Sequence, residues 1–220
     1  MSAAPEKLAE LRRLLAQRFP AAARAPGRTL RTGIPAIDES TGGGLPLGAV
    51  SEIVCSAPSC GSQLLLGQLL AVTRSTRTRV GLIDATDAFD PDSHPPDSLA
   101  HLLWVRCPPS SLATAIALQA ADLLARDANL GLVILDLRQS PEADLCRIPG
   151  PQWYRFQRAI EPADLALVVL TPRPSVPSAQ VRLVLNISHS VAALEAERSL
   201  LTASLDPTLQ RQRAQAPLTA

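Results

Sequence analysis

The residues whose types and spacing bear most directly on chemistry lie between positions 56 and 63, in a loop of small residues. An apolar stretch, 49 to 54, precedes the loop and a leucine-rich stretch follows it. This order of strand, loop and helix is typical of a phosphate-binding loop with the pattern GxxxxGK[ST], in which backbone N–H groups surround the phosphates, the lysine neutralises charge and the hydroxyl binds magnesium. Gly61 is retained here, but Ser62 replaces the lysine and Gln63 replaces the hydroxyl residue. One lost charge-assisted contact costs about 1.5 to 3 kcal/mol, so we expect a loop that keeps its shape and loses most of its chemistry.

A second position of this kind is Asp136, which ends the apolar run LGLVILD. Such a run is typical of a buried parallel strand, and an acid at its end resembles the magnesium-binding position of a Walker B element. The alternative is that Asp136 is only the polar end of a central strand. We favour this alternative, because Gln63 has no hydroxyl with which to share a metal ion. Gly61, Ser62, Gln63 and Asp136 therefore form a degenerate nucleotide site, for which we expect no cofactor and no metal.

Three further features have both a functional and a structural interpretation. Leu8, Leu11, Leu15 and Phe19 form an apolar stripe on an expected helix, 5 to 19, which either packs on its own core or docks on a partner. Arg155 lies beside Trp153 and Phe156 in an expected helix, where arginine and aromatic side chains can stack on bases, although aromatic residues at helical spacing are more often core. Arg173 lies in a proline-rich loop, 171 to 177, and is the other residue with which DNA contact is expected, if there is any.

Composition limits the classes of function. The 220 residues are 46% hydrophobic, which is enough for one substantial core, and the formal net charge is +1, which gives no global attraction to nucleic acid. Without a hydrophobic leader or an apolar run of membrane length, we expect a cytoplasmic protein with no membrane contact. The four cysteines show no C-x-x-C pair, so neither a zinc site nor a disulfide is expected.

Expected strands and helices alternate along the chain and position these residues. This alternation predicts an α/β fold with a mostly parallel sheet flanked by helices on both faces. Residues 1 to 27 are expected to form an N-terminal helix and linker, 28 to 205 the core domain, and 206 to 220 a polar tail that is disordered or ordered by a partner. Ser110 or Ser111 is expected to cap a helix that ends near Asp127. The strand 180 to 187 is expected near a sheet edge, and 191 to 201 is either a short helix or more sheet.

The segment from Thr32 to Glu52 resembles the leading part of the RecA recombinase core, and it resembles the ImuA family of RecA-related proteins more closely. The matching residues keep the order G-x-P-A-x-D, G-G-G-L and G-A-x-x-E. They are Gly33, Pro35, Ala36, Asp38, Gly43, Gly44, Leu45, Gly48, Ala49 and Glu52. The resemblance covers about residues 30 to 190. The expected strand that ends at Asp84 leads into the run D-A-T-D-A-F-D-P. In RecA a similar strand leads into D-A-E-x-A-x-D-P, and the glutamate of that run activates water. Thr86 occupies the position of this glutamate here.

The ImuA resemblance implies a non-catalytic interaction protein of bacterial DNA-damage tolerance, part of a mutasome that supports translesion synthesis and induced mutagenesis. The implied partners are an ImuB-type polymerase homologue, RecA and an error-prone replicative polymerase, with a possible homo-oligomer. One alternative is a divergent ATPase of the recombinase or circadian-clock type, which binds phosphate through backbone amides and borrows a basic residue, such as Arg138 or Arg173, from a neighbour. Another is a cell-division inhibitor similar to SulA, a branch of the same fold that does not use ATP.

Overall fold

A seven-stranded sheet forms the centre of the computed structural model, which describes residues 28 to 213. Its order is β5-β4-β6-β7-β3-β8-β9, and neighbouring strands are parallel except β8 and β9. The strands are β3 (Ala49–Cys55), β4 (Val80–Asp84), β5 (Leu102–Arg106), β6 (Leu132–Asp136), β7 (Ala166–Thr171), β8 (Val181–Leu185) and β9 (Thr208–Gln212). A small antiparallel pair, β1 (Thr29–Leu30) and β2 (Leu45–Pro46), precedes them.

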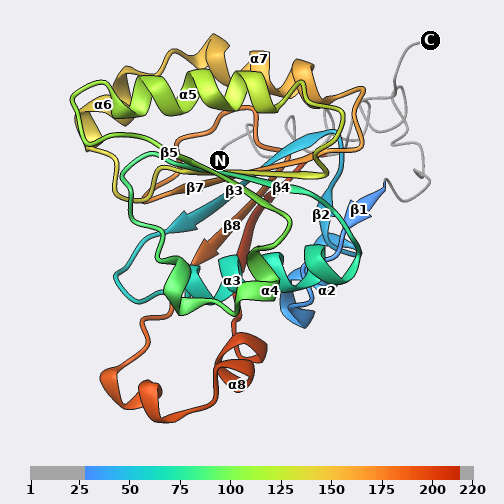
Figure 1. The fold of residues 1–220 in the computed structure, drawn as a ribbon, viewed down its shortest axis with the longest axis vertical. Helices are drawn as coiled ribbons and strands as arrows, with labels where there is room; N and C mark the ends of the chain where they lie inside the picture. The colour runs from blue at the N-terminus through green and yellow to red at the C-terminus, as the bar shows by residue number, and fades with distance from the viewer. Residues whose placement is uncertain (1–27, 214–220) are drawn as a thin grey trace, which may run out of the picture.

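Helices cover both faces of this sheet (Figure 1). They are α2 (Pro35–Thr41), α3 (Ser62–Ser75), α4 (Pro96–Leu99), α5 (Ala113–Leu124), α6 (Glu142–Arg147), α7 (Gly150–Ile160) and α8 (Arg198–Ala203), with the 3-10 turns η1 (Pro91–Ser93) and η2 (Val191–Glu195). Figure 1 shows α5 and α7 on one face and α2, α3 and α4 on the other. The expected α/β class with a mostly parallel, doubly covered sheet is confirmed, and it is compatible with a RecA-like core. None of the helices in the described range is both long and apolar enough to cross a membrane.

Two apolar cores fill the spaces between the sheet and its helices. Leu65, Leu66 and Leu69 of α3 are buried on one face, and Trp153 and Phe156 of α7 are buried on the other. The interpretation of the two aromatic side chains as core is therefore confirmed. Strands β6 and β7 are buried along their whole length, because a parallel strand covered on both sides has no solvent-facing side chains.

The segment that carries the resemblance has a structural explanation. Asp38 accepts hydrogen bonds from the backbone N–H and the hydroxyl of Thr32, at 2.9 and 2.8 Å, and from the N–H of Gly33 at 3.2 Å. Gly44 has a φ of +130°, and a Cβ atom there would lie 2.2 Å from the Leu30 carbonyl oxygen. The threonine, glycine and aspartate positions thus fix the turn that leads the chain into β3.

The C-terminal part of the core differs from expectation. Residues 206 onward were expected to be disordered or ordered by a partner, but β9 pairs antiparallel with β8 and extends the sheet past residue 205. Leu209 packs against the core while its neighbours remain more exposed. Backbone pairing with the edge of β8 also stabilises β9. Strand β8 keeps the alternating burial expected near an edge. The segment 191 to 201 takes the helical alternative, as η2 and the start of α8.

Helix α5 also begins differently. Its N-cap is Leu112, and Ser110 accepts the Leu112 N–H at 3.3 Å instead of capping the helix as expected. The helix packs through Thr114, Ala117 and Ala121, because small side chains allow its backbone to approach the sheet closely. Leu112 and Leu123 are 63% and 71% exposed as a result. The N-terminal helix, with the stripe Leu8, Leu11, Leu15 and Phe19, lies outside the described residues.

His94 is buried where α8 meets the rest of the domain. Its ring stacks on Phe89 at a centroid distance of 5.1 Å, and Phe89 meets Trp104 edge-on at 5.3 Å. Arg198 of α8 donates to the carbonyl oxygens of Ser93, at 2.8 Å, and Gln63, at 3.4 Å. The His94 Nε2 atom has no hydrogen-bond partner among the described residues. A protonated ring would therefore be poorly solvated in this position.

We expect the free energy of unfolding to fall as the pH drops below about 6.5, the ordinary pKa of histidine. Burial, and then the charge of Arg198, lowers the pKa of His94, and burial lowers the pKa of His101 in the same direction. Between the lowered and the ordinary pKa the unfolded chain binds a proton that the folded chain does not, so acid favours unfolding. Urea midpoints measured from pH 7.5 to 5.5 test this. The His94→Gln variant should show a smaller pH slope, and an unchanged slope in that variant would contradict the assignment.

Candidate functional site

The residues expected to form a degenerate nucleotide site lie at the carboxyl ends of β3 and β6, where α3 begins. Strand β3 ends at Cys55, the loop occupies residues 56 to 61, and Ser62 is the first residue of α3. Gly61 is the N-cap of α3 with φ +84° and ψ 11°, a left-handed conformation that favours glycine. The chain therefore turns sharply from the loop into α3, and the structure brings Gly61, Ser62 and Asp136 to one place.

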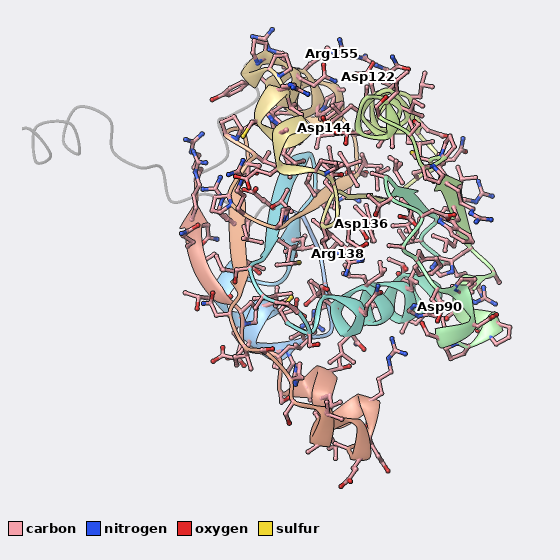
Figure 2. The ribbon with its side chains drawn as sticks, turned by 90° about the vertical axis from the view of Figure 1, so that its left-hand side faces the viewer. Asp90, Asp122, Asp136, Arg138, Asp144 and Arg155 are labelled. Carbon is pink, nitrogen blue, oxygen red and sulfur yellow. The ribbon has the colours of Figure 1, made fainter. Side chains whose placement is uncertain are left out.

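Arg138 fills the space between the loop and the end of β6. Its guanidinium group contacts both carboxylate oxygens of Asp136, with Nε at 2.9 and 3.1 Å and Nη2 at 2.5 Å. Its Nη1 atom donates to the Ser62 hydroxyl at 2.6 Å. Figure 2 shows Asp136 and Arg138 close together between the sheet and α3. We call the connected side chains of Ser62, Arg138 and Asp136 the arginine bridge.

In the arginine bridge, the charged side chains of Asp136 and Arg138 are paired with each other. Arg138 is 11% exposed and Asp136 is 3% exposed, so the pair is largely withdrawn from water. The guanidinium charge offsets the Asp136 carboxylate, and the oxygens that would face magnesium accept hydrogen bonds from Arg138. The residues present therefore do not fit a magnesium-bound triphosphate. The described residues also hold no group of three or more His, Cys, Asp and Glu side chains that could bind a metal ion.

A C-terminal segment, residues 186 to 205, covers the outer side of this loop. The Ser188 hydroxyl donates to the Pro58 carbonyl oxygen at 2.8 Å, and the His189 N–H donates to the Ser59 carbonyl oxygen at 3.0 Å. A cavity of about 790 Å³ remains between the loop, Arg138 and this segment. Its lining combines small polar loop residues with apolar side chains such as Leu201, which differs from the charged surroundings that a triphosphate requires.

Thr86, which stands where the RecA resemblance places a catalytic glutamate, has no side chain that can act as a base. Asp84, at the end of β4, accepts the backbone N–H groups of Ala88, at 3.0 Å, and Phe89, at 2.8 Å, and so shapes the loop that contains Thr86. The neighbouring Asp87 is held in a two-point ion pair by Arg106, at 2.7 and 2.8 Å. The hydrogen bonds from Arg106 hold the pKa of Asp87 below its usual range, which makes this carboxylate a weaker base.

The two arginines expected to contact DNA do not join this site. Arg155 pairs with Asp122 of α5 at 3.1 Å, and Figure 2 places that pair well away from Asp136. Arg173 pairs with Glu142 and also donates to the Cys146 sulfur at 2.7 Å. Each of these arginines has a carboxylate partner on the surface, which leaves less positive charge for a phosphate backbone.

Glu52 is a buried charge whose role the sequence did not reveal. It lies in the middle of β3 with 0% exposure and accepts hydrogen bonds from the Thr171 hydroxyl (3.0 Å) and from the N–H groups of Ser175 (2.6 Å) and Val176 (3.1 Å). Arg182, its register neighbour on β8, donates to the other carboxylate oxygen at 2.5 Å. These bonds hold the loop 171 to 177 against the sheet.

Comparison with known proteins adds no assignment. A scan against protein-family models gave no match, and a search of curated proteins gave no significant relative.

Proposed function

We propose that this chain is a non-catalytic RecA-like interaction protein of bacterial DNA-damage tolerance that acts in the cytoplasm. The arginine bridge is the observation that supports a non-catalytic role. A basic residue does reach the loop, as a divergent ATPase would require, but Asp136 and Ser62 hold it inside the protein. The charge of Arg138 thus stabilises the fold of the site and is not free to bind a phosphate.

The second support is the pattern of what is kept and what is replaced. The turn residues Asp38, Gly44 and Gly61 retain the positions that build the leading segment and the loop. The groups that would bind a triphosphate or activate water are replaced at Ser62, Gln63 and Thr86. A RecA-like scaffold that cannot turn over ATP is suited to constant binding of a protein partner.

The resemblance to ImuA supplies the class of partner. The proposed complex contains an ImuB-type polymerase homologue and an error-prone replicative polymerase, with RecA as a further partner. Co-purification of the tagged chain from cells treated with a DNA-damaging agent tests this directly. Recovery of a polymerase homologue supports the proposal, whereas recovery of a cell-division protein in its place would contradict it and favour the SulA-like alternative.

Deletion of residues 1 to 20 is expected to weaken partner recovery without unfolding the core. The described residues 28 to 213 form both apolar cores and all seven strands of the main sheet, so the cooperative melting transition should remain. Co-purification and thermal melting of the truncated and full-length chains measure the two effects. Replacement of Leu8 and Leu15 by serine is the matched control, because it alters only the apolar stripe. Loss of the melting transition on truncation would contradict this division of roles.

A further inference from the structure

Helix α5 has an apolar face on the side that points away from the sheet. The residues of α5 that are buried against the sheet are Thr114, Ala117 and Ala121. At 3.6 residues per turn, positions 112, 116 and 123 fall on the opposite side of the helix. They hold Leu112, Ile116 and Leu123, whose exposed fractions are 63%, 36% and 71%. We call these three side chains the α5 face.

The apolar surface continues from the α5 face to the edge of the sheet. Strand β5 is an edge strand, and its Leu103 is 48% exposed. Side chains two residues apart in a strand point to the same side, so Leu103 lies on the side of Val105, which packs against the core beneath α5. Leu103 and the α5 face therefore lie on the same side of the sheet. Exposed apolar side chains gathered in this way mark a contact surface.

The described chain begins at the end of the sheet where α5 ends. Arg28 forms an ion pair with Asp164, which lies two residues before β7. Helix α5 ends at Leu124, and the chain then enters β6, the parallel neighbour of β7. A depression of about 400 Å³ extends from Asp164 to Asn129, in the turn that follows α5. The residues that precede Arg28 therefore leave the described domain beside the C-terminal end of α5.

The linker is long enough to place the N-terminal helix over the α5 face. Helix α5 packs over β4 and β6, the next strands after β7 in the sheet. The linker crosses two strand spacings, about 10 Å, and rises about 20 Å to the axis of a helix outside α5. Residues 20 to 27, when extended, span about 26 to 29 Å.

The apolar stripe expected in residues 5 to 19 has the same length as the α5 face. Leu8 and Phe19 are 11 positions apart, and so are Leu112 and Leu123. At 1.5 Å per helical residue, each row extends over about 16 Å. Phe19 is the end of the stripe nearer to the linker, which places it beside Leu123, and Leu8 then lies beside Leu112. The two helices would run parallel.

We propose that residues 5 to 19 bind as a helix to the outward α5 face of their own chain. This contact removes the apolar side chains of both rows from water, which stabilises it. The linker holds the two surfaces at a high effective concentration, so contact within one chain prevails over contact with a second copy. The packing does not depend on the proposed function. A partner that binds the stripe must first displace it from α5.

Hydrogen exchange of the purified full-length protein, followed by mass spectrometry, tests this contact. Amide exchange in residues 8 to 19 should be slowed by about tenfold or more, because a packed helix exchanges only when it opens. In the double variant Leu112→Ser with Leu123→Ser, these amides should exchange as fast as in an unfolded peptide, while β6 and β7 stay protected. Leu200→Ser on α8 is the matched control, since it removes an exposed leucine elsewhere, and it should leave the protection unchanged.

A photo-crosslink covers the case in which the double variant does not fold, and it separates the chain's own segment from that of a second copy. With p-benzoylphenylalanine at position 123, the expected product is a monomer in which this position is joined to tryptic peptide 14 to 18 or 19 to 24. A crosslinked dimer would overturn the proposal, and so would crosslinks to other parts of the chain alone. Fast exchange of residues 8 to 19 in the wild type, or protection that survives in a folded double variant, would also overturn it.

Discussion

Replacement of Arg138 by methionine is expected to lower the free energy of unfolding by about 3 to 5 kcal/mol, because it leaves a buried carboxylate without its counter-charge. Asp136 is 3% exposed, and all three contacts that its oxygens accept from a side chain come from Arg138. The Ser62 hydroxyl loses its 2.6 Å donor in the same variant. Chemical denaturation of the two proteins at neutral pH measures the difference.

Two controls distinguish the buried pair from an ordinary ion pair. Arg126→Met removes the exposed i,i+4 pair with Asp122 and should cost at most about 0.5 kcal/mol. The double variant Arg138→Met with Asp136→Leu should regain most of the loss, since no charge is then left unpaired. An Arg138→Met variant as stable as the wild type would show that the arginine bridge does not hold the site together.

Replacement of Glu52 by alanine is expected to have an effect of similar size, about 3 to 5 kcal/mol. The change leaves Arg182, 15% exposed, without its carboxylate and frees the donors of Thr171, Ser175 and Val176. At about 2 to 4 °C per kcal/mol, the melting temperature should fall by roughly 6 to 20 °C. Limited proteolysis should also cut the loop 171 to 177 faster, because its backbone anchors are gone.

The matched control for Glu52 is Glu142, which pairs with Arg173 on the surface with 73% of its side chain exposed. Glu142→Ala should change stability by no more than about 1 kcal/mol. Glu52→Gln separates shape from charge. It keeps the side-chain volume but offers Arg182 no negative charge, and so it should remain clearly destabilised. A Glu52→Ala protein that melts like the wild type, with an equally protected loop, would contradict the anchoring role.

The sequence was sufficient to predict the local structure of the part of the site that is continuous in the chain. The run from β3 through Gly61 to α3 carries its own signals, namely an apolar stretch, a glycine that can take a left-handed conformation and a row of leucines. Trp153 and Phe156 were also recognisable as core from their helical spacing. These features depend on neighbours within one or two turns, which a local pattern can show.

The sequence was not sufficient to predict contacts between segments that lie far apart in the chain. Arg138 could be named as a possible donor to the loop, but its contact with Ser62 joins residues 76 positions apart, and only the sheet order brings β6 beside that loop. Glu52 belonged to the resemblance, yet its four partners lie more than 100 residues later in the chain. Strand β9 was missed for a related reason. Its polar, alternating residues resemble a solvated tail until the edge of β8 is available to pair with them.

Calorimetric titration of the full-length protein with ATP in the presence and absence of magnesium tests the central claim most directly. With Arg138 bound to Asp136 and Ser62, we predict no saturable heat of binding in either condition, while an intact phosphate-binding-loop recombinase in the same cell binds normally. Micromolar, magnesium-dependent binding that is lost on replacement of Asp136 by asparagine would contradict the account.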